Sequence, residues 1–480
     1  MKRTMVKAAT LAATAAILMS TVPFTATSVS AGENKYPAIA TYNETEVVKR
    51  GAVSGKWGTC DWNISDDGVL TISGGIATGS VLKQLGDRLQ WSSPWDSNKY
   101  NIKKIVIQDN ISFEGNASLA HLFYWFNFLK EIDGLDKLDT SNVTNMEGMF
   151  AGCYKLTTLD LSKFNTSNVT NTKFMFQGCS ELTTIDVSKF DTSNVEDMGY
   201  MFSDCSELTT LDVSKFNTSN VTNMPFMFGS CAALTTIDVS KFDTSNVTDM
   251  ESMFSGCYAL TTIDVSKFNT SNVTNMKSMF ANCAALTTID VSKFDTSNVT
   301  SMQSMFLNCK SLTALDVSDF DTSNVEHMGY MFGNCNALTA LDVSKFNTSE
   351  VQNIYSMFVG CNNIAKLDLS SFNLEKASVN NGAKVEIAKV LPSESKCLKQ
   401  IIMPSNLGEE NNIETILNEM YSIASSWTDK TDNVVYSSKP DTLIAGHRYV
   451  VTGSEYDKDD SNDNADTNKS GLLQDADGNW

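Results

Sequence analysis

The sequence predicts an α/β solenoid: stacked coils with parallel β-strands and short helical turns, closed by β-rich caps. Three observations support this fold class. A motif recurs every 26 residues, one stretch of it alternates apolar and polar residues, and another repeats apolar residues three or four apart. Units of this length cannot bury an apolar face alone, so they stack on their neighbours.

Residues 1–31 have the pattern of a secretory signal peptide. Lys2, Arg3 and Lys7 precede a short apolar run from Ala8 to Val22, and small residues follow at a cleavage-like site that ends at Ala31. The run is too short to span a membrane, and no later segment reaches the roughly 18 apolar residues that spanning requires. We therefore predict a secreted protein, extracellular or on the cell surface.

Residues 32–111 are predicted to form an N-terminal β-rich cap, because they hold strand-like runs such as "GVLTIS" and "IKKIVIQD". This segment contains four of the seven tryptophans, namely Trp57, Trp62, Trp91 and Trp95. Residues 112–137 are a degenerate repeat with one inserted residue, in which Leu129, Ile132 and Asp133 match the repeated pattern. A cap of this kind covers the open end of a solenoid.

Residues 138–371 hold nine units of 26 residues without insertions. Within a unit, "LTTIDVS" places Leu260, Ile263 and Val265 on one side, which predicts a strand with one buried face. The polar link "F-[ND]-T-S-N" should turn a corner, because its residues bond their own backbone in turns. At a strand spacing of about 4.8 Å, the nine units should span roughly 40 Å.

The second half of each unit predicts one helical turn. Met250, Met253, Phe254 and Cys257 recur at helical spacing, so we expect them in the core. Pro225 directly follows the first methionine of its unit, where a proline is tolerated only at the start of a helix. The predicted turn therefore begins after that methionine, and "NVTNM" before it should be extended.

The C-terminal segments complete the predicted organisation. Residues 372–402 are degenerate repeats, residues 403–453 a C-terminal cap with further strands, and residues 454–480 an acidic linker. The final "SGLLQDADGNW" is similar to the opening of a further module, which would be truncated at Trp480.

The repeated unit "LTTLDVSKFNTSNVTNMPFMFGSC" closely resembles the leucine-rich repeats of BspA-like bacterial surface proteins. The resemblance covers residues 138–371, and the segment from Gly55 is similar to the one that often precedes such arrays. It implies an exported bacterial protein with a right-handed leucine-rich-repeat superhelix and a role in adhesion to other cells. It implies no catalytic residues, and the sequence shows no LPxTG-type sorting motif or lipobox cysteine.

One cysteine recurs in every coil, at helical spacing from the Met-Phe pair. We expect a buried ladder of free thiols, since cysteine behaves as a small hydrophobe; disulfides, metal binding and redox chemistry are the alternatives. Cys60 and Cys397 lie in opposite caps, too far apart to pair. The ladder comprises Cys153, Cys179, Cys205, Cys231, Cys257, Cys283, Cys309, Cys335 and Cys361.

An aspartate recurs on the outward side of the predicted strand, between threonine and serine. We expect a solvated ladder that also serves as a binding strip for a protein or glycan partner, with a calcium site as the alternative; a flat row of single carboxylates is a poor calcium cage. The lysine three residues later should offset part of the charge. The column comprises Asp160, Asp186, Asp212, Asp238, Asp264, Asp290, Asp316, Asp342 and Asp368.

The composition restricts the function classes. A formal net charge of −20 disfavours nucleic acid and anionic membranes as partners and favours cations and basic protein patches. His121, His327 and His447 lie in separate parts of the chain without a catalytic or metal-binding spacing, so we expect neither an enzyme nor a cofactor. The leading hypothesis is a monomeric, adhesin-like binding protein, and the alternative is a structural spacer that projects a further module from the cell wall.

Overall fold

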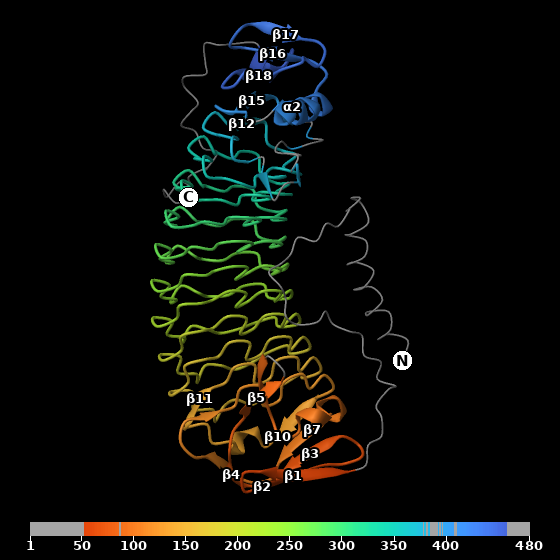
Figure 1. Ribbon diagram of the computed structural model, residues 1–480, viewed down its shortest axis with the longest axis vertical. Helices are drawn as coiled ribbons and strands as arrows, with labels where there is room; N and C mark the ends of the chain where they lie inside the picture. The colour runs from red at the N-terminus through yellow and green to blue at the C-terminus, as the bar shows by residue number, and fades with distance from the viewer. Residues whose placement is uncertain are drawn as a thin grey trace, which may run out of the picture. The chain divides into compact units, whose positions relative to one another are not determined.

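The computed structural model consists of coils stacked along one axis, with strands at both ends (Figure 1). It describes residues 52–85, 88–377, 379, 380, 383, 384, 392, 395, 397–407 and 410–457. The chain divides into two units, Met1–Val48 and Lys49–Trp480, and every described residue belongs to the second. The predicted signal peptide and the predicted module after residue 457 lie outside the described residues.

The N-terminal cap is built on a five-stranded sheet in the order β1-β2-β3-β7-β10. Its strands are β1 (Val53–Trp57), β2 (Cys60–Ile64), β3 (Val69–Ile72), β7 (Lys104–Ile107) and β10 (Glu131–Asp133). Pairing is antiparallel from β1 to β3 and parallel from β3 to β10. The sheet thus ends on β10, which belongs to the degenerate repeat before the array.

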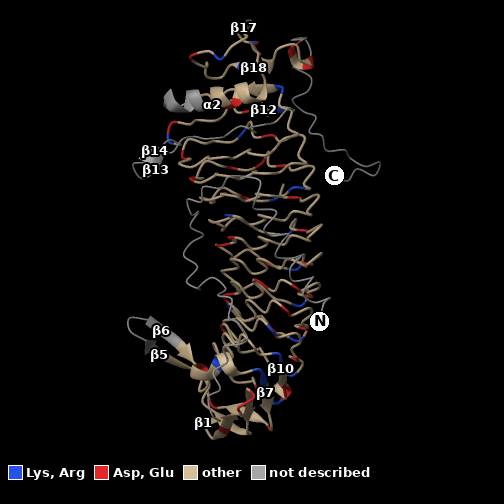
Figure 2. Ribbon diagram, turned by 90° about the vertical axis from the view of Figure 1, so that its right-hand side faces the viewer, with Lys and Arg blue, Asp and Glu red and all other residues tan. Residues whose placement is uncertain are grey.

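Smaller elements complete this cap. They are the pair β4 (Gly75–Ala77) and β8 (Ile111–Phe113), the hairpin β5 (Val81–Leu85) and β6 (Arg88–Ser92), the pair β9 (Ala117–Ser118) and β11 (Val143–Asn145), and the 3-10 helices η2 (Asp96–Asn101) and η3 (Leu135–Lys137). The β5–β6 hairpin projects away from the body of the cap (Figure 2).

Aromatic rings join the N-terminal cap to the coils. Trp57 and Trp62 pack edge-on against Trp95, with ring centroids 5.3 and 6.1 Å away. Trp95 in turn stacks on Phe123 of the first degenerate coil at 6.0 Å. All four side chains are buried, so one apolar core runs from the cap into the array.

The coils of the array confirm the predicted solenoid. Val247, Met250, Phe254 and Cys257 are fully buried, and the same positions are buried in the other units. The second phenylalanine of the unit forms a continuous stack from Phe150 to Phe358, with neighbouring centroids 5.5 to 6.1 Å apart. Each coil therefore buries its apolar face against the next.

The long parallel strand predicted for "LTTIDVS" is wrong for the middle of the array: among the described residues between β11 and β12 (Lys366–Asp368), only isolated bridges form. Turns close at both ends of the stretch, where Leu260 N donates to Cys257 O and Phe268 N to Val265 O. The short extended run between them has one backbone bond to the preceding coil, from Thr261 N to Thr235 O at 3.1 Å. Parallel bridges instead link the residue before the first methionine, from Asn145 to Asn353.

The predicted helical turn is also wrong. The amides of Met253, Ser255 and Cys257 bond to carbonyls three residues earlier at 3.0 to 3.3 Å, which makes three overlapping turns. The alternate amides, from Ser252 to Gly256, donate to the next coil at 2.7 to 2.9 Å. A helix would direct all these amides along its own axis and leave the stack without them. The positive φ of Ser252 (54°) and Gly256 (76°), each third in its turn, is what a type II turn requires.

The C-terminal cap continues the stack through a second sheet. Its order is β12-β15-β18-β16-β17, with β15 (Gln400–Ile402), β18 (Arg448–Val451), β16 (Trp427–Asp429) and β17 (Val434–Tyr436). The remaining elements are the pair β13 (Val379–Asn380) and β14 (Ala383–Lys384), the 3-10 helix η4 (Glu455–Asp457) and the helix α2 (Glu410–Ile423).

Helix α2 was not predicted from the sequence. Its Ile416, Leu417 and Met420 are buried, and the Trp427 indole donates to Met420 O (3.1 Å) and Ala424 O (3.2 Å). These contacts tie the helix to strand β16. Within the described part of the chain, no helix is long and apolar enough to cross a membrane.

Candidate functional site

The aspartate column lies on the surface of the array, where the sequence placed it. Seven of its nine members are exposed, and Asp316 and Asp368 are half-buried. The neighbouring Ile263 and Val265 are buried while Thr262 and Asp264 are exposed, so the outward face follows the alternation of the sequence. We call the threonine, aspartate and serine positions of Thr262, Asp264 and Ser266, repeated through the array, the TDS strip.

Each aspartate of the TDS strip also shapes the backbone. Its Oδ1 accepts the amide of the serine two residues later, at 2.9 to 3.0 Å in all nine units. This bond closes an Asx turn, which leads the chain out of the extended run and fixes the carboxylate. The aspartate is thus a turn residue as well as a surface charge, and its orientation is the same in every coil.

The hydrogen bonds of the turn keep these carboxylates charged. The Ser188 hydroxyl and amide lower the pKa of Asp186, with a smaller contribution from the Lys189 ammonium. The same causes lower the pKa of Asp160, Asp212, Asp238 and Asp264. Near neutral pH these five carboxylates are therefore negatively charged.

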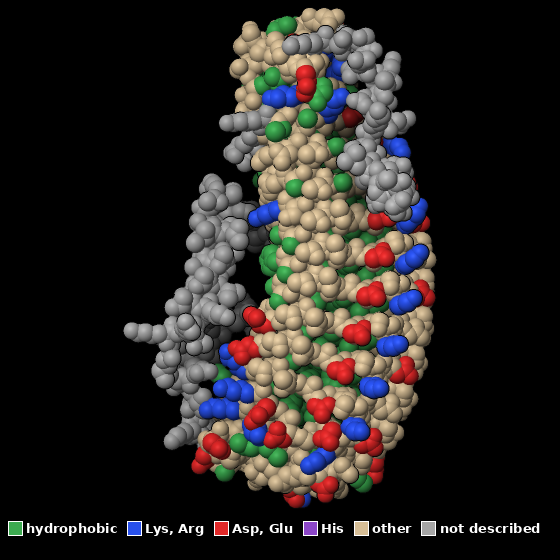
Figure 3. All heavy atoms as spheres, turned by 180° about the vertical axis from the view of Figure 1, so that it is seen from behind, with side chains coloured by type: hydrophobic (Ala, Val, Ile, Leu, Met, Phe, Trp, Pro, Cys, Tyr) green, Lys and Arg blue, Asp and Glu red, His purple; other side chains and the backbone are tan. Residues whose placement is uncertain are grey.

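A row of lysines runs beside these carboxylates. The lysine three residues after the aspartate is exposed in seven units, from Lys163 to Lys345. Figure 3 shows the acidic and basic side chains as adjoining rows along the stack. In one unit Asp319 takes the lysine's place and lies close to Asp316 and Asp321 in sequence. The surface is therefore a paired row of opposite charges with one acidic coil.

Five residues after each aspartate of the TDS strip the chain has an asparagine or an aspartate, and the two alternate from Asn165 to Asp295. This Asn/Asp column has a structural function that accommodates both residue types. Oδ1 of Asn165 and of Asp191 each accepts the amide of the serine two residues later, at 3.0 Å. An amide and a carboxylate supply this oxygen equally well. The alternation therefore changes the charge of the surface without changing the turn.

The threonine after that column locks the coils together. Buried Thr166 donates its hydroxyl to Asp191 O at 2.9 Å and accepts Asp191 N at 2.8 Å. The asparagine two residues after the threonine bonds to the preceding coil instead. For example, Asn194, which follows Thr192, donates its Nδ2 to Ser167 O at 2.7 Å. Stacking thus explains the "T-S-N" that recurs in eight of the nine units.

The nine cysteines of the ladder are buried free thiols in this structure. Each Sγ donates to the carbonyl of a phenylalanine in the preceding coil, at 3.0 to 3.3 Å. Burial raises the pKa of Cys257 to about 12 and raises that of the other ladder thiols too. Because nucleophilic and metal-binding cysteines act as thiolates, these positions are unsuited to such chemistry. Cys60 is buried and Cys397 exposed.

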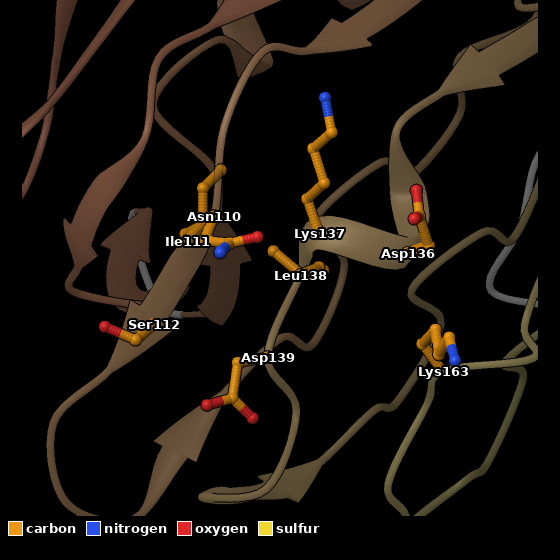
Figure 4. Close-up of a pocket in the computed structure, with 8 residues that line it drawn as sticks. All are labelled: Asn110, Ile111, Ser112, Asp136, Lys137, Leu138, Asp139 and Lys163. Carbon is orange, nitrogen blue, oxygen red and sulfur yellow. The ribbon is translucent and has the colours of Figure 1, made fainter.

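A hollow of about 360 Å³ lies where the N-terminal cap meets the first full unit. It is lined by Asn110, Ile111, Ser112, Asp136, Lys137, Leu138, Asp139 and Lys163 (Figure 4). Lys137 Nζ donates to the carbonyls of Ile107 (3.2 Å) and Gln108 (2.9 Å), and Asp139 Oδ1 accepts Ser141 N. The lining includes neither a histidine nor a cysteine, and two of its charged groups serve the backbone, so it does not form an acid–base pair for catalysis.

The three histidines lie apart, as the sequence indicated, but one of them has partners that the sequence did not reveal. His447 Nδ1 is 2.9 Å from Asp429 Oδ2 and 3.8 Å from Asp432 Oδ2 in the C-terminal cap. Fifteen residues separate Asp432 from His447, and strand pairing between β16 and β18 brings them together. The spacing of these three residues in the sequence is not one that indicates a metal site, so the sequence alone did not reveal the set.

A family model described as "Mycoplasma protein of unknown function, DUF285" matches residues 117–236, 204–289 and 285–389, which together span more than half of the chain. No curated protein matches the sequence.

Three solved bacterial structures are similar to this chain at low identity. A leucine-rich repeat protein from Bacteroides ovatus is 17% identical over 71% of this chain and 98% of its own, with a TM-score of 0.30. One from Eubacterium ventriosum is 15% identical over 63% and 95%, with a TM-score of 0.27. A leucine rich cell surface protein from Faecalibacterium prausnitzii is 18% identical over 60% and 93%, with a TM-score of 0.23. Scores this low carry no argument about function.

Proposed function

Since this chain belongs to the family described as "Mycoplasma protein of unknown function, DUF285", a description that assigns no activity, we propose its function from the surface of its array. The protein is a non-enzymatic, adhesin-like bacterial surface protein. Its TDS strip binds a protein or glycan of a host or neighbouring cell. The strip's repetition is the observation that carries this proposal: nine coils present the same fixed carboxylate.

The packing supports a binding surface rather than a reaction centre. The apolar and thiol positions of each coil are buried, and the threonine and asparagine side chains of "T-S-N" bond neighbouring coils. The threonine and aspartate side chains of the TDS strip and the lysines beside it remain exposed in most units. A rigid row of weakly interacting groups gains affinity by engaging a repetitive partner at several coils together. Basic protein segments and hydroxyl-rich glycans have the matching chemistry.

The signal-like N-terminus and the resemblance to BspA-like proteins support export and display on the cell. In this proposal the protein acts as a monomer, uses no cofactor and contacts neither nucleic acid nor the membrane interior. N-terminal sequencing of secreted protein tests export: a mature chain that begins at Gly32 is expected.

A structural spacer remains the second candidate, because the phenylalanine stack runs unbroken from Phe150 to Phe358 and makes the array a stiff rod. Binding of labelled mature protein to epithelial cells and to a printed glycan array separates the two functions. Saturable binding on either surface supports the adhesin. Linear, non-saturable signal on both would support the spacer.

A further inference from the structure

Three side chains meet in the C-terminal cap, far from the TDS strip. Asp429 is the last residue of β16, Asp432 lies in the turn before β17, and His447 directly precedes β18. Their ligand atoms all lie within 4.8 Å of one another. Nδ1 of His447 faces both carboxylates, at 2.9 Å from Asp429 and 3.8 Å from Asp432.

The backbone around these side chains is fixed on both sides. Strand pairing sets Asp429 opposite Tyr449, and Lys430 N donates to Arg448 O at 2.9 Å. On the other side, Met403 N donates to His447 O at 2.9 Å. The three residues are therefore held by the sheet, which is the support that a preformed ligand site needs.

The Asp429 carboxylate is oriented as well as buried. Its side chain is fully buried, and its Oδ1 accepts the amides of Thr431 (2.9 Å) and Asp432 (3.3 Å). The phenol of buried Tyr449 lies near this carboxylate and accepts the amide of Ile444 at 3.1 Å. The bonds to Oδ1 aim Oδ2 at His447, in the way that outer hydrogen bonds orient metal-binding carboxylates. A fully buried carboxylate beside a second carboxylate needs positive charge nearby, which a bound cation would supply.

We propose that Asp429 Oδ2, Asp432 Oδ2 and His447 Nδ1 bind one divalent transition-metal cation of the Zn²⁺ type. Metal–ligand distances of about 2.0 to 2.2 Å place tetrahedral ligand atoms roughly 3.4 Å apart, and the distances at Nδ1 lie on either side of that value. Imidazole favours Zn²⁺ and its neighbours, whereas Ca²⁺ selects six to eight oxygens.

The proposed site has one open side. The His447 side chain is 17% exposed and that of Asp432 is 53% exposed, so a cation enters from solvent past Asp432. The cation would lie between Nδ1 of His447 and the two carboxylates. Bound metal would fasten the β16–β17 turn to the start of β18 and stabilise the end of the solenoid.

Calorimetry on the tag-free mature chain, freed of metal with a chelator, tests this site with ZnCl₂ as the probe. We expect saturable uptake of one Zn²⁺ per chain, a higher Tm, and CaCl₂ binding at least tenfold weaker. Asp432→Asn should weaken Zn²⁺ binding at least tenfold; since its side chain is half-exposed, the variant should fold. His447→Gln should abolish uptake.

Two matched controls isolate the site. Asp441→Asn removes an exposed carboxylate of the same cap, and His327→Ala removes a histidine of the array; both should bind Zn²⁺ as the parent does. Absence of saturable uptake, or equal Zn²⁺ affinity in D432N and D441N, would overturn the proposal. Calcium binding as tight as that of Zn²⁺ would overturn the assignment of the metal class.

Discussion

Single hydroxyl groups join neighbouring coils in this protein. Thr166 bonds both the amide and the carbonyl of Asp191 in the next coil, and the equivalent threonines are buried throughout the array. Of the two residues that follow it, Ser167 donates its amide to close an Asx turn, and Asn168 donates its side-chain amide to the preceding coil. The polar residues that are repeated most strictly therefore serve stability, while the charged residues beside them are available for binding.

Thr166→Val tests the hydroxyl ladder at one coil. Valine keeps the shape but removes the hydroxyl partner of the partly buried amide and carbonyl of Asp191, which should lower the free energy of unfolding by about 1 to 3 kcal/mol. Urea denaturation measures the loss. Thr184→Val, an exposed threonine of the same unit, is the control and should change the stability by less than about 0.5 kcal/mol. Equal effects would contradict the ladder.

The cysteine ladder makes a second prediction about single residues. Burial and raised pKa values should keep the ladder thiols unreactive in the folded chain, so a thiol reagent at pH 8 should modify only exposed Cys397 rapidly. In denaturant all 11 cysteines should react. Fewer reactive thiols after unfolding without reductant would reveal disulfides and contradict the free-thiol structure.

The segment of overlapping turns in each coil, such as residues 250–257, is an element that we call the turn ribbon. Alternate amides of the turn ribbon close its turns, and the others bond to the next coil. This arrangement places two residues per coil at positive φ, such as Ser278 (56°) and Asn282 (62°). The sequence spacing of methionine, phenylalanine and cysteine suits a helix equally well, because both structures bring residues three apart to one side. A helix does not form because carbonyls of the next coil accept alternate amides of the segment. This competition produces no periodic pattern in the sequence.

Ser278→Gly and Ser278→Ala distinguish the turn ribbon from a helix. In a helix alanine is the more favourable residue by about 1 kcal/mol, whereas at positive φ glycine is favoured by about 1 to 2 kcal/mol. We therefore expect the glycine variant to be the more stable of the two in urea denaturation. The reverse order would contradict the turn ribbon.

For the molecule as a whole, the sequence predicted the stacked coils, their buried positions and the exposed aspartates, since a 26-residue repeat with alternating polarity determines all three. It did not predict helix α2, although Ile416, Leu417 and Met420 show helical spacing, because the segment lies outside the repeat. The pairing of His447 with Asp429 also went unpredicted, since it depends on how β16 and β18 align.

The acid sensitivity of the whole array follows from its turns. The pKa of Asp186, Asp191, Asp238 and Asp243 is lowered from the ordinary 3.8 by serine hydroxyls and amides. A carboxylate with a lowered folded-state pKa adds stability above its unfolded-state value, and this stability is lost as the pH falls through the folded-state value. Tm should therefore drop below about pH 4, and less steeply when all four become asparagine. An unchanged slope in that variant would contradict this origin.

The most direct test of the proposed function compares two matched triple variants on the cells or glycans that the mature protein binds. One variant changes three aspartates of the TDS strip to asparagine: Asp186, Asp238 and Asp290. The control variant changes the aspartate five residues after each of them to asparagine: Asp191, Asp243 and Asp295. Both variants lose three charges and keep an Oδ1 acceptor for each Asx turn. We predict that the strip variant binds at least tenfold more weakly and that the control binds like the parent. Equal affinity of the two variants would contradict the assignment of the TDS strip as the binding surface.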